Sequence, residues 1–322
     1  MIAAPPPLAE ARETVVLEKA SVFYGEVIGL SQVDLTVGNG ITGIVGPNGC
    51  GKSTLMRTLT GLIGPSEGTI RVLGGDPFTD PSVRQRIGLV PATECFYEGL
   101  SGRKNLEVAF VSQGWPRNGA KDLASRALEI VGLTSDGDRA YGTWSRGMRQ
   151  RLKLGLTLAG NAELVLLDEP FLGVDPPSRR HLRNLIEALG AEGRTVLVSS
   201  HVLHEIESLT DRVGVLAHGR LLGFGRIGDL VESLKDRNPH RIQLETRSAR
   251  ELASLLVGWD HVREVQIDEG RVEFVTERPD LAYIAIGTLS GQLPEPIEGV
   301  RTLDDSLEAV FRHVTAAGSR RL

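Results

Sequence analysis

Short apolar, β-branched runs alternate with helical spacings from about residue 14 to residue 225. We expect strands over 15–17, 33–37, 41–45, 69–73, 87–90, 164–167, 195–199 and 213–216. We expect helices over 53–62, 103–111, 121–131, 148–158, 178–189 and 203–209. Asp80 and Asp175 each precede a proline, so both are expected to be N-caps. The alternation of strands and helices predicts an α/β domain.

The pattern changes after about residue 235. Residues 241–246 and 271–276 alternate polar and apolar side chains, which is typical of half-buried antiparallel strands. Helical spacing recurs over 252–257, 284–289 and 307–314. We therefore expect three parts: a loose N-terminal tail over 1–13, the α/β domain over 14–235, and a small C-terminal α+β accessory domain over 236–322.

Composition adds limits without naming a function. The 322 residues are 41% hydrophobic and 24% charged, which suits a soluble protein with a sizeable core. The net charge of −5 argues against an extended nucleic-acid footprint. Two cysteines, Cys50 and Cys95, fit a reducing compartment. No membrane span is expected, because the longest uncharged stretch, 35–51, is rich in glycine and polar residues. No signal peptide is expected either, because residues 1–10 contain three prolines and no basic region before an apolar core.

One stretch carries specific chemistry. It fits the phosphate-binding pattern G-x-x-x-x-G-K-[ST] and consists of Gly46, Pro47, Asn48, Gly49, Cys50, Gly51, Lys52, Ser53 and Thr54. It lies between a predicted strand and a predicted helix, where backbone N–H groups can converge on a phosphate chain. Lys52 supplies positive charge, and the Ser53 hydroxyl is placed to bind Mg²⁺. An ordinary glycine-rich turn would not explain the Lys-Ser-Thr ending, so the stretch predicts a nucleoside triphosphate ligand.

A second motif supplies acid groups. The predicted strand over 164–167 runs into Asp168 and Glu169. Because side chains alternate along a strand, we expect the two carboxylates to point in different directions. Asp168 would then hold Mg²⁺ through water while Glu169 faces the γ-phosphate. A strand that simply ends in charged residues is the alternative, and the phosphate loop makes it the weaker one.

The order of motifs resembles the ATP-binding cassette (ABC) family over about residues 14–225. The phosphate loop is followed by Trp-Ser-Arg-Gly-Met-Arg-Gln-Arg at 144–151, Leu-Leu-Asp-Glu-Pro at 166–170 and Ser-Ser-His at 199–201. The Trp-Ser-Arg-Gly-Met segment is similar to the family's signature, in the form common among drug, antibiotic, polysaccharide and sodium exporters. Residues 306–311 also resemble the tail of that subgroup. The resemblance implies a P-loop nucleotide-binding domain with an antiparallel β subdomain and a helical subdomain, using ATP and Mg²⁺.

The resemblance also implies residue roles. Ser145 and Gly147 would contact ATP held by a second ATPase protomer, in a homodimer or a heterodimer. His201 would contact the γ-phosphate, Asp175 would sense the partner protomer, and Tyr24 would stack on adenine. Simpler alternatives stay open: Ser145 and Asp175 as helix caps, and Tyr24 as a strand-end packing residue.

The chain departs from the family at Ala92, where a glutamine usually touches magnesium and couples to the membrane partner. Glu94 is a nearby acid, and the sequence leaves open whether it compensates. Residues 93–106 are the expected docking segment for that partner.

Two other clusters favour structural interpretations. The locally basic run Arg146, Arg149, Arg151 and Lys153 is short in an acidic chain, so no nucleic-acid partner is expected. His201, His204 and Glu205 form only a partial metal-ligand set.

The sequence therefore predicts the ATP-hydrolysing subunit of an export-type transporter, peripheral to the cytoplasmic face of the membrane and working with separate membrane-spanning permease subunits. Glu169 would polarise the attacking water, while His201 and Lys52 would stabilise the transferring phosphoryl group. A soluble cassette ATPase acting on ribosomes or DNA is the alternative, although the chain has one cassette and no long coiled-coil insertion. A GTPase switch would need an Asn-Lys-x-Asp motif, which is missing, and an inactive binding module is the remaining alternative. The transported substrate cannot be inferred from the sequence.

Overall fold

The computed structural model describes residues 13–230, 240–268, 270–289 and 291–303. The chain forms two compact units, Met1–Gly225 and Arg226–Leu322. Within the described ranges, no helix combines the length and the apolar character needed to cross a membrane. The predicted tail and the predicted boundary near residue 235 fall almost entirely outside the described ranges, so those limits stay predictions.

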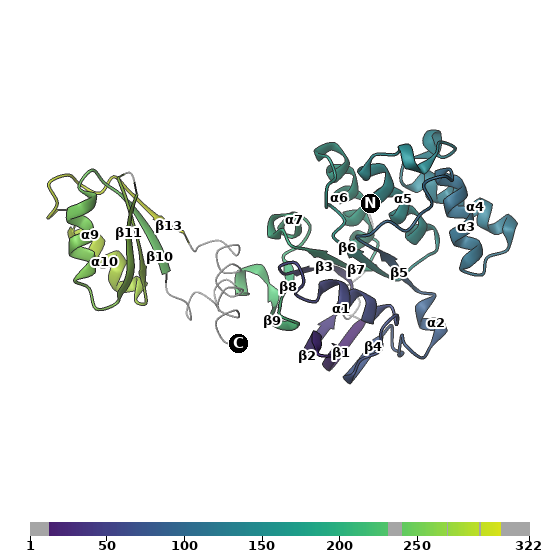
Figure 1. The fold of residues 1–322 in the computed structure, drawn as a ribbon, viewed down its shortest axis with the longest axis horizontal. Coiled ribbons are helices and arrows are strands. Elements are labelled where there is room, and N and C mark those ends of the chain that lie inside the picture. Colours follow the sequence, from purple (N-terminus) through teal and green to yellow (C-terminus); the bar gives the residue numbers. More distant parts are fainter. Residues whose placement is uncertain (1–12, 231–239, 269, 290, 304–322) are drawn as a thin grey trace, which may run out of the picture. The chain divides into compact units, whose positions relative to one another are not determined.

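A six-stranded sheet is the centre of the first unit. Its order is β5 (Ile87–Val90), β6 (Leu164–Asp168), β7 (Thr195–Ser200), β3 (Gly40–Val45), β8 (Arg212–Ala217) and β9 (Arg220–Arg226). The first five strands pair in parallel. Strands β6 and β7 are buried along their whole length, which explains their continuous apolar runs. Helices α1 (Lys52–Leu59) and α6 (Pro176–Ala191) lie on opposite faces of this sheet (Figure 1).

An antiparallel sheet packs beside the first. Its order is β2 (Val27–Val37), β1 (Val15–Tyr24) and β4 (Glu67–Val72). Val15, Leu17 and Leu35 from this sheet join Leu164 and Leu197 from the parallel sheet in one apolar core. Strand β1 is longer than predicted because it continues through a bulge, which the polar pair at 18–19 hides in the sequence.

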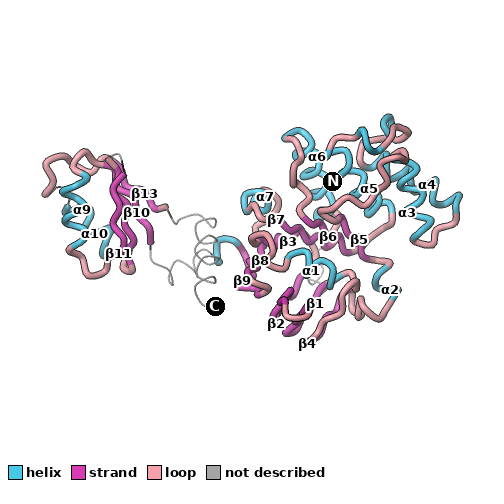
Figure 2. The backbone as a smooth tube through the Cα atoms, in the orientation of Figure 1, coloured by secondary structure: helices cyan, strands magenta, loops and turns pink. Residues whose placement is uncertain are grey.

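Three helices form a separate group next to β5, visible together in Figure 2. They are α3 (Gly102–Ser112), α4 (Arg117–Ile130) and α5 (Arg146–Ala159). Phe110, Leu128, Tyr141 and Leu152 are buried in the core of this group. The antiparallel sheet and the helical group are the two subdomains that the sequence predicts.

The helices predicted in the first unit are confirmed with shifts at their ends. Helix α1 ends at Leu59, three residues early, because the chain turns at Gly61 with φ of 73°. Asp80 and Asp175 are N-caps as predicted, accepting hydrogen bonds from the backbone amides of Ser82 and Ser178. The remaining short elements are α2 (Pro81–Arg84), α7 (Leu203–Glu207) and the 3₁₀ turns Thr134–Asp136 and Tyr141–Thr143.

The second unit is a βαββαβ fold. It contains β10 (His240–Glu245), α9 (Ala249–Val257), β11 (Val262–Asp268), β12 (Arg271–Thr276), α10 (Pro279–Leu289) and β13 (Gly299–Thr302). The strands are antiparallel in the order β11-β12-β10-β13, which is the ferredoxin-like arrangement. Both helices contribute to one core with Ile242, Leu244, Val272 and Phe274. Strands β11 and β13 are not predicted from the sequence, and the predicted helix 307–314 lies outside the described residues.

Candidate nucleotide-binding site

The loop between β3 and α1 has the backbone shape of a phosphate cradle. Gly49 and Gly51 take φ angles of 78° and 113°, which are strained for any residue with a side chain. A Cβ atom at Gly46 would lie 2.3 Å from the carbonyl oxygen of Leu216, so no side chain fits there. The loop therefore leaves its backbone amides uncovered at the start of α1, where the helix dipole favours an anion.

Lys52 reaches back over this loop. Its Nζ atom donates hydrogen bonds to the carbonyls of Gly46, at 2.7 Å, and Pro47, at 3.2 Å. The same atom is 3.2 Å from Oε1 of Glu169, and the Lys52 side chain is only 6% exposed. The lysine charge is therefore fixed at the mouth of the cradle instead of moving freely in solvent.

Ser53 and Asp168 meet across the same site. The Ser53 hydroxyl donates to Oδ2 of Asp168 at 2.8 Å, joining the start of α1 to the end of β6. The other oxygen, Oδ1, accepts a 2.6 Å hydrogen bond from the Ser199 hydroxyl on β7. A hydroxyl and a carboxylate form an all-oxygen donor pair, which is the chemistry that Mg²⁺ prefers. The two metal-binding residues predicted from the sequence thus fit that ion.

The carboxylates of Asp168 and Glu169 contact different groups, but not for the predicted reason. Strand β6 ends at Asp168, and Glu169 adopts a left-handed φ of 51°. Its amide donates to the carbonyl and the hydroxyl of Ser199, at 3.2 Å and 3.1 Å. These bonds hold a conformation that costs energy for a non-glycine residue at a functional position. A turn of the backbone, not strand alternation, separates the two carboxylates.

The Glu169 carboxylate bridges two cationic or donor groups. Oε1 faces Lys52, and Oε2 is 2.8 Å from Nδ1 of His201, one residue beyond β7. His201 is partly exposed, whereas Glu169 is buried. Acid, lysine and histidine thus surround one point above the phosphate loop, and these are the three residues predicted to be catalytic.

Two further predicted residues lie around the loop. Cys50 is buried, and this burial raises the pKa of its thiol, an effect that the Lys52 charge only partly opposes. Tyr24, the last residue of β1, is 43% exposed. Its hydroxyl is 3.5 Å from Oγ1 of Thr54, so an uncovered aromatic ring stands beside the start of α1.

Ser145, Gly147 and Asp175 gather at a different place, where α5 meets α6. Ser145 caps α5 by accepting from the amide of Met148, and a Cβ atom at Gly147 would lie 3.3 Å from Oδ1 of Asp175. The hydrogen bond from the Ser178 amide lowers the pKa of the Asp175 carboxyl. Within the described ranges, no hydrogen bond or ion pair links Ser145, Gly147 or Asp175 to the phosphate loop.

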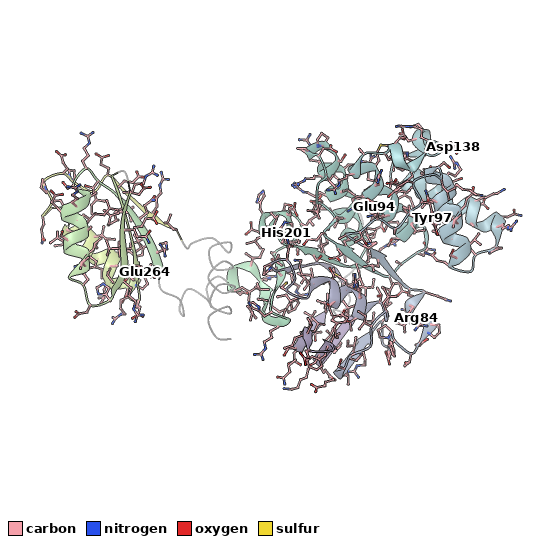
Figure 3. All side chains as sticks on the ribbon, viewed as in Figure 1. Arg84, Glu94, Tyr97, Asp138, His201 and Glu264 are labelled. Atoms are coloured by element: carbon pink, nitrogen blue, oxygen red, sulfur yellow. The ribbon has the colours of Figure 1, made fainter. Side chains whose placement is uncertain are left out.

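The loop after β5 contains Ala92, and Glu94 in this loop has partners of its own. Oε2 of Glu94 accepts a 2.6 Å hydrogen bond from the Tyr141 hydroxyl. The pKa of Tyr141 is raised, first by burial and then by Glu94. Figure 3 shows Glu94 within the helical group, well apart from His201. The Glu94 carboxylate therefore contacts Tyr141 and Lys153 of the helical group.

The basic run at the start of α5 and the residues around His204 make contacts within the protein. Arg149 and Arg151 donate to the backbone carbonyls of Trp144 and Val131. Glu205 binds the Ser200 hydroxyl at 2.7 Å and Arg179 at 3.2 Å, while His204 is 86% exposed. Across the described part of the chain, no three acidic, histidine or cysteine side chains are placed to share a metal ion.

Sequence reasoning missed two residues at or near the site. Ser199 ties both acidic residues to β7, and its signal is a polar side chain at a fully buried position of an apolar strand. Lys153 was grouped with the basic run, yet it is 2% exposed. Its signal is its position in α5, between Leu152 and Leu154, which are also buried.

Comparisons of the sequence and of the fold with known proteins agree with a nucleotide-binding site. The family model described as "ABC transporter" matches residues 30–172. The daunorubicin/doxorubicin resistance ATP-binding protein DrrA of Streptomyces peucetius is 37% identical over 73% of this chain and 71% of its own length. The daunorubicin resistance ATP-binding protein DrrA3 of Streptomyces coeruleorubidus is 32% identical over 96% of this chain and 98% of its own. A solved ADP conformation of MJ1267, an ATP-binding cassette of an ABC transporter, is 25% identical with a TM-score of 0.60, covering 69% of this chain and 94% of that one. The chain thus belongs to the ABC transporter family and carries that family's ATP-binding, ATP-hydrolysing domain.

Proposed function

We propose that this chain is the ATPase subunit of an export-type transporter, acting at the cytoplasmic face of the membrane with separate membrane-spanning permease subunits. The proposed ATP hydrolysis rests on one observation: the Glu169 carboxylate contacts both Lys52 and His201 beside the phosphate loop. The export part is supported by relatives named for drug resistance, one of which aligns over nearly the whole chain.

Glu169 is the general base in this proposal. In the free protein its carboxylate is occupied by Lys52 on one side and His201 on the other. A γ-phosphate entering the cradle competes for both groups, because both prefer the more highly charged oxygens. Glu169 is then released to accept a proton from an attacking water, while Lys52 and His201 stabilise charge on the transferring phosphoryl group.

Mg²⁺ would be held by Ser53 and Asp168, whose oxygens already face each other. When bound, the ion would neutralise charge on the β- and γ-phosphates. Ser199 keeps Oδ1 of Asp168 occupied, so Oδ2, which faces Ser53, would be the oxygen available to the ion.

The second half of each site would come from another ATPase protomer, identical or related. Ser145 and Gly147 stand at the N-terminus of α5, where backbone amides and the helix dipole suit a γ-phosphate. Asp175 stands beside Gly147 and would contact the partner at the same surface.

A mixing experiment tests the composite site. We expect Lys52→Ala and Ser145→Arg to be inactive alone, because each damages both sites of a symmetric dimer. Mixed, they form some dimers with one intact site, so ATPase activity returns to a fraction of the wild-type rate. Wild-type turnover by Ser145→Arg alone would overturn the composite site. Failure of the wild-type chain to hydrolyse ATP at any protein concentration would overturn the proposed function itself.

A further inference from the structure

Lys153 is almost completely buried, which is rare for a lysine. It lies on α5, eight residues after Ser145, and its side chain is 2% exposed. Lysine is almost never fully buried unless its charge is paired. Its Nζ atom donates to the carbonyl of Thr93 at 2.8 Å and to the carbonyl of Pro91 at 3.3 Å. These two carbonyls belong to the residues before and after Ala92, so the lysine holds the backbone of the loop after β5 by hydrogen bonds.

The loop also supplies the groups that stabilise the buried ammonium charge of Lys153. Burial lowers the pKa of Lys153, and the carboxylate of Glu94, 4.0 Å away, opposes that shift. The buried charge is thus stabilised by two carbonyl dipoles and one acid, all supplied by residues 91–94. Removing the loop contact would leave a lysine charge buried with no partner, which proteins avoid.

The same loop also packs on the start of α5. Glu94 accepts the hydrogen bond of Tyr141, and the Tyr141 ring lies 5.8 Å from that of Trp144, the residue before the Ser145 cap. Phe96 packs edge-on against Tyr141 at 5.5 Å. The loop is therefore attached to α5 both at its beginning and, through Lys153, in its third turn.

We propose that Lys153 is a positioning residue that clamps the loop after β5 to α5 and supplies the mechanical coupling that Ala92 cannot. The inference rests on the proposed function, in which Ser145 at the start of α5 meets the nucleotide of the second protomer. A displacement of the loop must then move α5, and closure of the dimer on α5 must move the loop. The lysine takes only the coupling part of the missing glutamine's role, because its ammonium group is committed to the backbone and to Glu94.

This division of roles gives a measurable signature. Among the described residues, no hydrogen bond or ion pair joins Lys153 to Lys52, Ser53 or Asp168, so the affinity of the single protomer for ATP should not depend on it. Turnover requires a correctly placed α5 and should depend on it. A lysine that only stabilised the fold would not change hydrogen exchange selectively in this loop. Its replacement would also not lower kcat while leaving the affinity for ATP unchanged.

The test uses full-length chains with Lys153→Met, which keeps the length of the side chain and removes its charge. Lys153→Arg is the conservative variant, and Lys121→Met, at an exposed position of α4, is the matched control. Hydrogen exchange of backbone amides over 92–98 reports the loop, and equilibrium ATP binding and steady-state ATPase activity report the site. For Lys153→Met we expect about tenfold or faster exchange in the loop, about tenfold or lower kcat, and ATP affinity within about twofold of wild type. Lys153→Arg should recover most of both losses, and Lys121→Met should match wild type.

Wild-type loop exchange in Lys153→Met would overturn the proposal, as would a parallel loss of ATP affinity and turnover. If Lys153→Met does not fold, Glu94→Gln decides by the same exchange measurement beside Tyr141→Phe, which removes only the Tyr141 hydrogen bond. Exchange over 92–98 that is faster in Glu94→Gln than in Tyr141→Phe supports the clamp, and equal rates refute it. A wild-type chain without ATPase activity would instead refute the proposed function, while the exchange result would still decide whether Lys153 holds the loop.

Discussion

Replacing Glu169 by glutamine should separate nucleotide binding from hydrolysis. The amide has the shape of the carboxylate but cannot accept the proton of the attacking water. Loss of a positioned acid–base group lowers turnover by about 10²–10⁴-fold, or roughly 2.7–5.4 kcal/mol of transition-state stabilisation. Because Glu169 occupies Lys52 at 3.2 Å in the free protein, its removal should also change binding.

The size of the binding effect follows from the contact that ATP must displace. A hydrogen bond to a charged group contributes about 1.5–3 kcal/mol, and the glutamine amide oxygen would keep part of it. We therefore expect ATP to bind Glu169→Gln as tightly as wild type or up to about tenfold more tightly, since 1.4 kcal/mol corresponds to a factor of ten.

The assay pairs steady-state phosphate release with equilibrium binding of labelled ATP. Glu187→Gln, at an exposed position of α6, is the matched control and should behave as wild type in both measurements. Near-normal turnover in Glu169→Gln would refute the general-base role. Binding that is weakened about tenfold or more would refute the competition between Glu169 and the γ-phosphate for Lys52.

Three further predictions concern the loop and its surroundings. Tyr24→Ala should weaken ATP binding by the roughly 1–3 kcal/mol of a base–aromatic stack, whereas Tyr24→Phe should bind normally in the same titration. Gly51→Ala should lower the melting temperature and abolish ATP binding, because its Cβ would lie 2.5 Å from the Gly29 carbonyl oxygen at a φ of 113°. In a Cys95→Ser background, iodoacetamide labelling of Cys50 should stay slow at neutral pH and accelerate only at a pH above the ordinary range for a cysteine thiol, because burial raises the pKa of this thiol. Saturating ATP should slow that labelling further, and fast labelling at pH 7 would contradict the prediction.

The sequence was most informative where one local pattern had one physical solution. The loop from Gly46 to Thr54 needs glycines for its backbone and a lysine for its charge, so pattern and structure agree. Ser53 and Asp168 were each predicted to bind Mg²⁺, and they meet in the structure because parallel strands end at one edge of a sheet. The caps Asp80 and Asp175 were equally local, since each hydrogen-bonds an amide two or three residues further on.

Other features depend on contacts between distant segments, which no local pattern contains. The left-handed backbone of Glu169 is held by Ser199, thirty positions along the chain. Lys153 has the charge of a surface residue and is buried only because the loop over 91–94 offers it carbonyls. Strand β11 was missed because Val262 and Val265 are only half-buried and a bulge interrupts the alternation between them.

The ferredoxin-like unit begins and ends on neighbouring strands. Strands β10 and β13 pair antiparallel, and the amide of Leu303 donates to the carbonyl of Arg241 at 2.8 Å. The point at which the chain enters this unit and the point at which it leaves are therefore adjacent. A short peptide that joins these two points could therefore replace everything between β10 and β13 without having to bridge a wide gap.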